Sequence, residues 1–89
     1  MSHPSEAALA TQLAAAGRAV AVGRLYAHYK HPDQTYRVTG FAILEATEEV
    51  AVIYQAQYGR GVSFVRALSS WHGIVSVGGR PQPRFHTVN

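Results

Sequence analysis

The fold is decided by the stretch Val50-Ala-Val-Ile-Tyr-Gln-Ala-Gln-Tyr-Gly-Arg-Gly-Val-Ser-Phe-Val-Arg66. Two apolar runs, rich in β-branched and aromatic residues, flank the segment Gly59-Arg60-Gly61. Such runs on either side of glycines are typical of two strands joined by a turn. We therefore expect strands over residues 50–57 and 62–67.

The segments before this hairpin also predict strands. Residues 23–30 alternate between apolar and polar side chains, as a half-buried strand requires. Pro32 and Asp33 predict a turn over residues 31–34, because proline fixes φ and aspartate bonds back to the backbone. A second strand is expected over 36–44, with Gly40 as a bulge or bend, and a hairpin tip over 45–48.

The segments after the hairpin are shorter. Residues 68–71 suit a single 3₁₀ turn, and residues 74–77 a fifth strand. The tail from Arg80 to Phe85 contains two prolines, so it is expected to lie extended outside the sheet, with Phe85 closing one end of the core. Together these elements predict a mainly β fold, a small five-stranded SH3-like barrel, with an OB-like barrel as the nearest competitor.

The first 22 residues form an alanine-rich extension that precedes the expected barrel domain, residues 23–89. Ser5 is a plausible N-cap and Gly17 a natural stop, so part of this extension is expected to be helical. Residues 7–22 are too short to span a bilayer core of roughly 30 Å. The segment before them lacks the basic and apolar parts of a secretory signal, so we expect a cytoplasmic protein with no membrane partner.

Composition narrows the possible functions. With 89 residues the chain is long enough for one small domain, and the absence of cysteine excludes disulfides, thiolate zinc sites and cysteine nucleophiles. The net charge is +3, and every acidic residue lies at or before Glu49. The second half carries only arginines as charged residues, which indicates either a mildly basic surface or a site for an anionic partner.

Several segments resemble a known bacterial family, called domain of unknown function 1653. They are Gly23-Arg-Leu-Tyr-Ala-His-Tyr-Lys30, Tyr36-Arg-Val38, Val52-Ile-Tyr-Gln-Ala-Gln-Tyr-Gly59, Val65-Arg66 and Pro83-Arg-Phe85. The resemblance covers residues 23–85 and implies a compact SH3-like barrel without an established activity. The chain departs from the family pattern at Phe64, where tryptophan is frequent, and at residues 44–46, where a histidine is common.

No catalytic or metal-binding signature stands out. His28, His31 and Asp33 have a spacing that could suggest a metal site, but strand residues three apart point to opposite faces and a further ligand is missing. The serines lack a nucleophile elbow, and the adjacent carboxylates of Glu48 and Glu49 face apart. We therefore expect no cofactor, no metal and, on balance, no enzyme.

The candidate site is a set of polar and aromatic side chains. These residues are Tyr26, His28, Tyr36, Tyr54, Gln55, Tyr58 and Arg66. Tyrosines offer flat faces for bases or prolines, and an arginine can hold a carboxylate or phosphate. The hypothesis is a binding module for an anionic ligand, either a nucleic acid, a nucleotide or a peptide. The chain is expected to be a monomer or homodimer. Two alternatives remain: the tyrosines complete the barrel rim while Arg66 pairs with Glu48 or Glu49, or the chain is an assembly protein that forms a homodimer or part of a larger complex.

Overall fold

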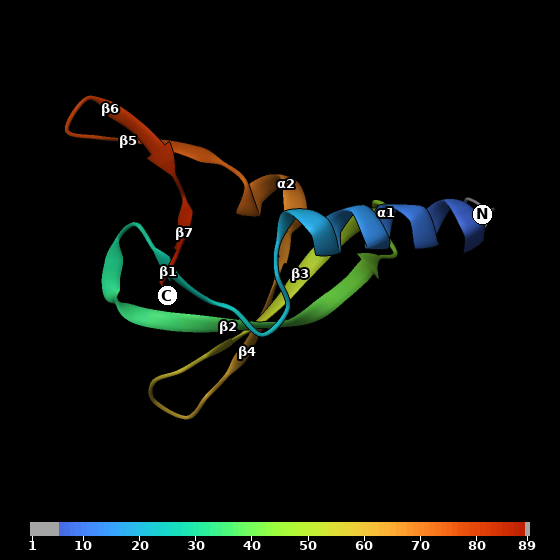
Figure 1. Cartoon of the computed structure of the whole chain (residues 1–89), viewed down its shortest axis with the longest axis horizontal. Coiled ribbons are helices and arrows are strands. Elements are labelled where there is room, and N and C mark those ends of the chain that lie inside the picture. Colours follow the sequence, from blue (N-terminus) through green and yellow to red (C-terminus); the bar gives the residue numbers. More distant parts are fainter. Residues whose placement is uncertain (1–5, 89) are drawn as a thin grey trace.

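The structure, a computed structural model, describes residues 6–88. Its elements in chain order are α1 (Glu6–Ala19), β1 (Leu25–His28), β2 (His31–Leu44), β3 (Glu49–Ala56), β4 (Ser63–Ala67), α2 (Leu68–Trp71), β5 (Ile74–Val77), β6 (Arg80–Pro83) and β7 (Phe85–Thr87). Five strands form one antiparallel sheet in the order β4-β3-β2-β1-β7, and β5 and β6 form a separate hairpin (Figure 1). The predicted mainly β fold is confirmed.

Strand β2 is the longest strand and joins the two parts of the sheet, because it pairs with both β1 and β3. The β2–β3 register shifts between Val38 and Gly40, which confirms the irregularity expected at Gly40. An extra residue in one strand bends it and increases its twist. Because β2 is bent, it pairs with β1 along one part and with β3 along another. The sheet is curled as a result (Figure 1).

The turn predicted over residues 31–34 is wrong. The chain reverses at Tyr29 and Lys30, and β2 already begins at His31. The β1–β2 register jumps from Ala27 opposite Thr35 to His28 opposite His31, so residues 32–34 have no partner in the ladder. A proline fits such a bulge because no hydrogen bond is required of its nitrogen.

The tail, which was expected to lie extended outside the sheet, forms two further strands. Strand β6 pairs with β5, and β7 pairs with β1. Pro81 and Pro83 are tolerated because a two-stranded hairpin consists of edge strands only. Phe85, which is 7% exposed, lies in the core as expected. The predicted helical turn at 68–71 is present, but its Leu68 O to His72 N bond makes it an α-turn instead of 3₁₀.

Helix α1 packs on the strands through its C-terminal end, where Ala16 and Val20 are each 1% exposed. Gly17 does not stop the helix, which continues to Ala19. A glycine inside a helix costs only about 1 kcal/mol, and the burial of Val20 outweighs this. Ser5, the predicted cap, lies outside the described residues. None of the helices in residues 6–88 is long and apolar enough to cross a membrane.

The core is a cluster of aliphatic and aromatic side chains from α2, the large sheet and the residue that follows α1. It consists of Val20, Tyr26, Val38, Val52, Tyr54, Trp71 and Phe85. Strands β4 and β7 are the two ends of the sheet, and no pairing joins them within residues 6–88. Within these residues the sheet is therefore curled but not closed by hydrogen bonds. The division into an extension, 1–22, and a domain, 23–89, stays a prediction.

Candidate functional site: an aromatic pocket with one arginine

A pocket of about 190 Å³ opens between the ends of the curled sheet. Strands β1, β2, β3, β4 and β7 each contribute to its wall. Its lining consists of His28, Tyr36, Tyr54, Phe64, Arg66 and Phe85. We call it the Arg66 pocket. Within the described part of the chain, its lining holds one permanent cation and no carboxylate.

Arg66 is held in place by three different contacts. Its Nη1 donates to Ser70 Oγ at 3.0 Å, and its Nε donates to Tyr54 Oη at 3.4 Å. Its guanidinium carbon lies 5.3 Å from the centroid of the Phe85 ring, within the range of a cation–π contact. All of these partners are neutral, so the positive charge of Arg66 is positioned without being neutralised by them.

The ring of Phe85 forms the floor beneath this arginine. Trp71 stacks on Phe85 with a centroid distance of 3.9 Å and an interplanar angle of 5°. Because Trp71 covers one face of the ring at this distance, the guanidinium of Arg66 lies over the other face. The core therefore fixes the floor of the pocket, which reduces the entropy lost when a ligand binds.

Two tyrosines close one side of the pocket. The hydroxyls of Tyr36 and Tyr58 are 2.6 Å apart, and their rings meet edge to face. Partial burial and then the hydrogen bond with Tyr58 raise the pKa of Tyr36 to about 12. The Tyr36 hydroxyl is thus a neutral hydrogen-bonding group at physiological pH. Tyr58 is 38% exposed and lies at the rim.

His28 faces a cationic environment. Burial, followed by the charges of Arg66, Arg84, Lys30 and His31, lowers the pKa of His28 below its ordinary value of 6.5. Its Nδ1 accepts a hydrogen bond from the backbone N–H of Lys30 at 3.2 Å, so this nitrogen carries no proton. The imidazole is therefore neutral at pH 7 and adds polarity to the pocket without adding charge.

The pH dependence of His28 gives a first prediction. An NMR titration of its imidazole should have a midpoint below 6.5, and Arg66→Gln should raise the midpoint because it removes one neighbouring cation. Since the unfolded chain binds this proton more readily, His28 should lower the stability of the fold as pH falls below 6.5. A midpoint at or above 6.5 in the wild-type chain would contradict the cationic environment.

The structure brings together only some of the predicted site residues. His28, Tyr36, Tyr54 and Arg66 line the pocket, and Tyr58 reaches it through Tyr36. Gln55 does not line it. It follows Tyr54 on β3, and successive residues of a strand point to opposite faces. Its side-chain amide instead donates to Gly61 O at 3.0 Å and braces the β3–β4 turn.

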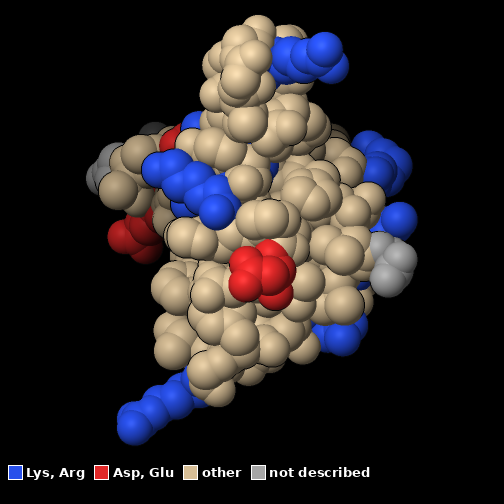
Figure 2. Space-filling view, turned by 90° about the vertical axis from the view of Figure 1, so that its left-hand side faces the viewer, with Lys and Arg blue, Asp and Glu red and all other residues tan. Residues whose placement is uncertain are grey.

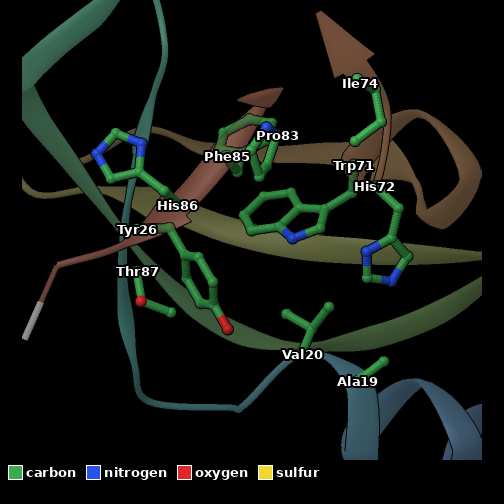
Figure 3. Close-up of a pocket in the computed structure, with 10 residues that line it drawn as sticks. All are labelled: Ala19, Val20, Tyr26, Trp71, His72, Ile74, Pro83, Phe85, His86 and Thr87. Carbon is green, nitrogen blue, oxygen red and sulfur yellow. The ribbon is translucent and has the colours of Figure 1, made fainter. Parts of the chain in front are cut away.

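Tyr26 belongs to a different, larger pocket. This pocket of about 460 Å³ lies between the end of α1, α2, the β5–β6 hairpin and β7. Figure 3 shows Tyr26, Trp71 and Phe85 gathered in it, with Val20 below them. The hydroxyl of Tyr26 accepts the backbone N–H of Ala21 at 3.2 Å, so this tyrosine ties the end of α1 to the sheet. The lining of this pocket contains no lysine or arginine.

Two lining residues of the Arg66 pocket are missing from the sequence-based site. Phe64 lies directly opposite Tyr54 in the β3–β4 register, with ring centroids 5.8 Å apart. Phe64 also precedes Arg66 by two residues on the same strand, and residues two apart on a strand share a face. This spacing could have predicted Phe64 as a member of the site. Phe85 was expected in the core alone, and only the pairing of β7 with β1 places its ring beside the pocket.

Charges are dispersed on the face drawn in Figure 2. Lysine and arginine side chains stand at separate points, acidic side chains lie among them, and most of this face is uncharged. A protein that tracks a nucleic acid backbone needs a continuous basic groove. This face provides no such groove.

The side chains that line the Arg66 pocket are aromatic rings, one imidazole and one guanidinium. No group of three histidine, aspartate or glutamate side chains within residues 6–88 could hold a metal ion. The lining includes one imidazole, but no serine, threonine or carboxylate that would work with it as a nucleophile or a base. The groups present can bind and orient a ligand through charge, hydrogen bonds and aromatic faces.

Fold and pocket together define a class: a small, mainly β domain with a rigid aromatic pocket around one arginine. The model of the family described as "Protein of unknown function (DUF1653)" matches residues 24–87. The chain therefore belongs to this family, in agreement with the resemblance seen in its motifs. It is also similar to a solved structure, a DUF1653 protein from Bordetella bronchiseptica. That similarity has 37% identity and a TM-score of 0.62, over 74% of this chain and 85% of the other. A comparison with curated proteins found no match.

Proposed function

We propose that the protein is a non-enzymatic binding module that holds an anionic group of its ligand in the Arg66 pocket. The observation that carries this proposal is the state of Arg66. It is fixed by Tyr54, Ser70 and Phe85, and the pocket lining contains no carboxylate to neutralise it. An arginine oriented in this way binds carboxylate or phosphate oxygens with paired hydrogen bonds.

The size and walls of the pocket set limits on the ligand. A volume of about 190 Å³ admits a side chain or a single flat group, but not an extended cofactor. Tyrosine hydroxyls and the neutral imidazole of His28 provide further hydrogen bonds beside the charge. The ligand is therefore expected to place one anionic group in the pocket and to make its remaining contacts on the surrounding surface.

The direct test measures how strongly small anions bind to variants in which one of two arginines is replaced. We expect inorganic phosphate and acetate to shift the amide NMR signals of the pocket residues at millimolar concentration. Arg66→Gln should weaken this binding by about tenfold to a hundredfold, because it removes a charged hydrogen bond of about 1.5–3 kcal/mol.

Arg60→Gln is the matched control, since it removes the same charge from the exposed β3–β4 turn. It should leave the affinity nearly unchanged. Equal losses in Arg66→Gln and Arg60→Gln would show that the anions respond only to net charge. The proposal would then fail, as it would if no anion caused shifts at the pocket.

A further inference from the structure

Strand β4 ends the large sheet with an open edge next to the Arg66 pocket. Within residues 6–88 its neighbour in the ladder is β3, and no strand lies on its other side. Apolar side chains at this edge are exposed: Val62 by 54%, Phe64 by 42% and Val65 by 57%. Natural sheets usually protect an edge with lysine, proline or a bulge. The sequence Ser63-Phe-Val-Arg-Ala67 contains no lysine or proline, and its register with β3 is regular. Its one charged side chain is Arg66, which points into the pocket.

The backbone of this edge is suited to pair with a further strand. In an antiparallel ladder, alternate residues turn their N–H and C=O groups away from the partner. The N–H of Ala56 donates to Val62 O at 2.9 Å, which sets this alternation for the β3–β4 pair. Val65, three residues beyond Val62, consequently directs its N–H and C=O toward the open side.

The edge and the pocket share two residues. Phe64 and Arg66 both line the Arg66 pocket, whereas Val65 points to the opposite face of the sheet. Side chains on adjacent strands that face the same way are about 4.5–5.5 Å apart when directly opposite. A strand added to β4 would therefore bring every second side chain to the pocket, and its other side chains would cover Val65.

Charge and apolar surface distinguish three possible partners for this edge: a second copy of the chain, a nucleic acid and an extended peptide. No acidic residue follows Glu49, so a second copy of β4 would bring another Arg66 close to the first, with no carboxylate from either strand. A nucleic acid would leave the valines of the edge uncovered. An extended peptide with alternating acidic and apolar side chains satisfies both the arginine and the apolar surface.

We propose that β4 binds an extended acidic segment of a partner protein by strand addition, with a carboxylate of this segment in the Arg66 pocket. This inference rests on the proposed anion-binding function and adds the partner and the mode of binding. Main-chain hydrogen bonds to β4 supply affinity, and the pocket selects glutamate or aspartate.

The test uses a capped seven-residue peptide in which valine alternates with glutamate. We expect it to shift amide signals along β4 and in the pocket, and to bind at least about tenfold more tightly than the same peptide with lysine in place of glutamate. N-methylation of the amides that face β4 should weaken binding by about fivefold to tenfold, because each methyl group removes a hydrogen bond. N-methylation of the alternate amides should have little effect.

Other outcomes separate this inference from the proposed function. If phosphate binds through Arg66 but both sets of N-methylated peptides bind equally, the pocket stands and strand addition is overturned. If the chain sediments as a dimer with the Val65 amide protected from exchange, a second copy occupies the edge and the inference is likewise overturned. If oligo(dT) binds more tightly than the peptide and this binding depends on Arg66, the partner is a nucleic acid and the inference is overturned. If neither phosphate nor the peptide binds, both proposals fail.

Discussion

Replacing Trp71 with alanine is expected to lower the free energy of unfolding by about 3–5 kcal/mol. Trp71 is 3% exposed and stacks on Phe85 at 3.9 Å. Its ring also meets Tyr26 at 5.2 Å and Tyr54 at 5.0 Å. The substitution leaves a cavity among these rings, and small domains have only about 5–15 kcal/mol of stability in total. Urea denaturation followed by circular dichroism measures the loss, since the chain has no other tryptophan for fluorescence.

Two further variants keep this prediction testable. Ile74→Ala is the control, because Ile74 is 66% exposed and its loss should change stability by no more than about 0.5 kcal/mol. Trp71→Phe should fold and lose less than Trp71→Ala, because an aromatic ring remains on Phe85. A loss below about 1 kcal/mol for Trp71→Ala would mean that the Trp71–Phe85 stack does not hold the core together.

Local sequence signals were sufficient for most of the strands. The alternation in residues 23–30 and the glycines at 59 and 61 correctly placed β1 and the β3–β4 hairpin, because these elements depend on neighbouring residues. The partners of the tail could not be deduced in the same way. Strand β7 lies beside β1, and this pairing joins residues far apart in the chain. The two prolines of β6 correctly excluded a central strand, but they gave no sign of the local hairpin that β6 forms with β5.

The site was predictable only in part, for a related reason. Residue types indicated tyrosines and an arginine, but the face to which each side chain points depends on register. Gln55 belongs to the predicted site as a hydrogen-bonding side chain, although strand alternation sends it to the face opposite Tyr54. Tyr26 belongs to it for the same reason, but its hydroxyl accepts a hydrogen bond from the backbone N–H of Ala21. Residue types alone therefore place these side chains in one site, whereas the strand register places them on different faces or in different pockets.

The position of α1 has a consequence for the proposed pocket. Val20 at the end of α1 belongs to the same core cluster as Trp71 and Phe85, and Phe85 is the floor beneath Arg66. The N-terminal segment therefore supports the Arg66 pocket without lining it. Removal of this segment should therefore lower the free energy of unfolding directly, and should weaken ligand binding only as a consequence.

A chain that begins at Gly23 is expected to be less stable than the full chain by about 2.5–4 kcal/mol. It loses the burial of Val20, worth about 1.5–3 kcal/mol, and the hydrogen bond to Tyr26, worth about 1 kcal/mol. Urea denaturation of both chains measures the difference, and sedimentation shows whether the uncovered rings cause association.

A matched pair of valines assigns this loss to the core. Val20 is 1% exposed and Val22 is 57% exposed, so the same change to alanine removes buried surface at one position and solvated surface at the other. Val20→Ala should cost about 1–2 kcal/mol, and Val22→Ala no more than about 0.5 kcal/mol. Equal effects, together with full stability of the shortened chain, would mean that residues before Gly23 are a dispensable extension. A loss confined to Val20 would instead extend the folding unit back into α1, because a domain includes every segment that completes its core.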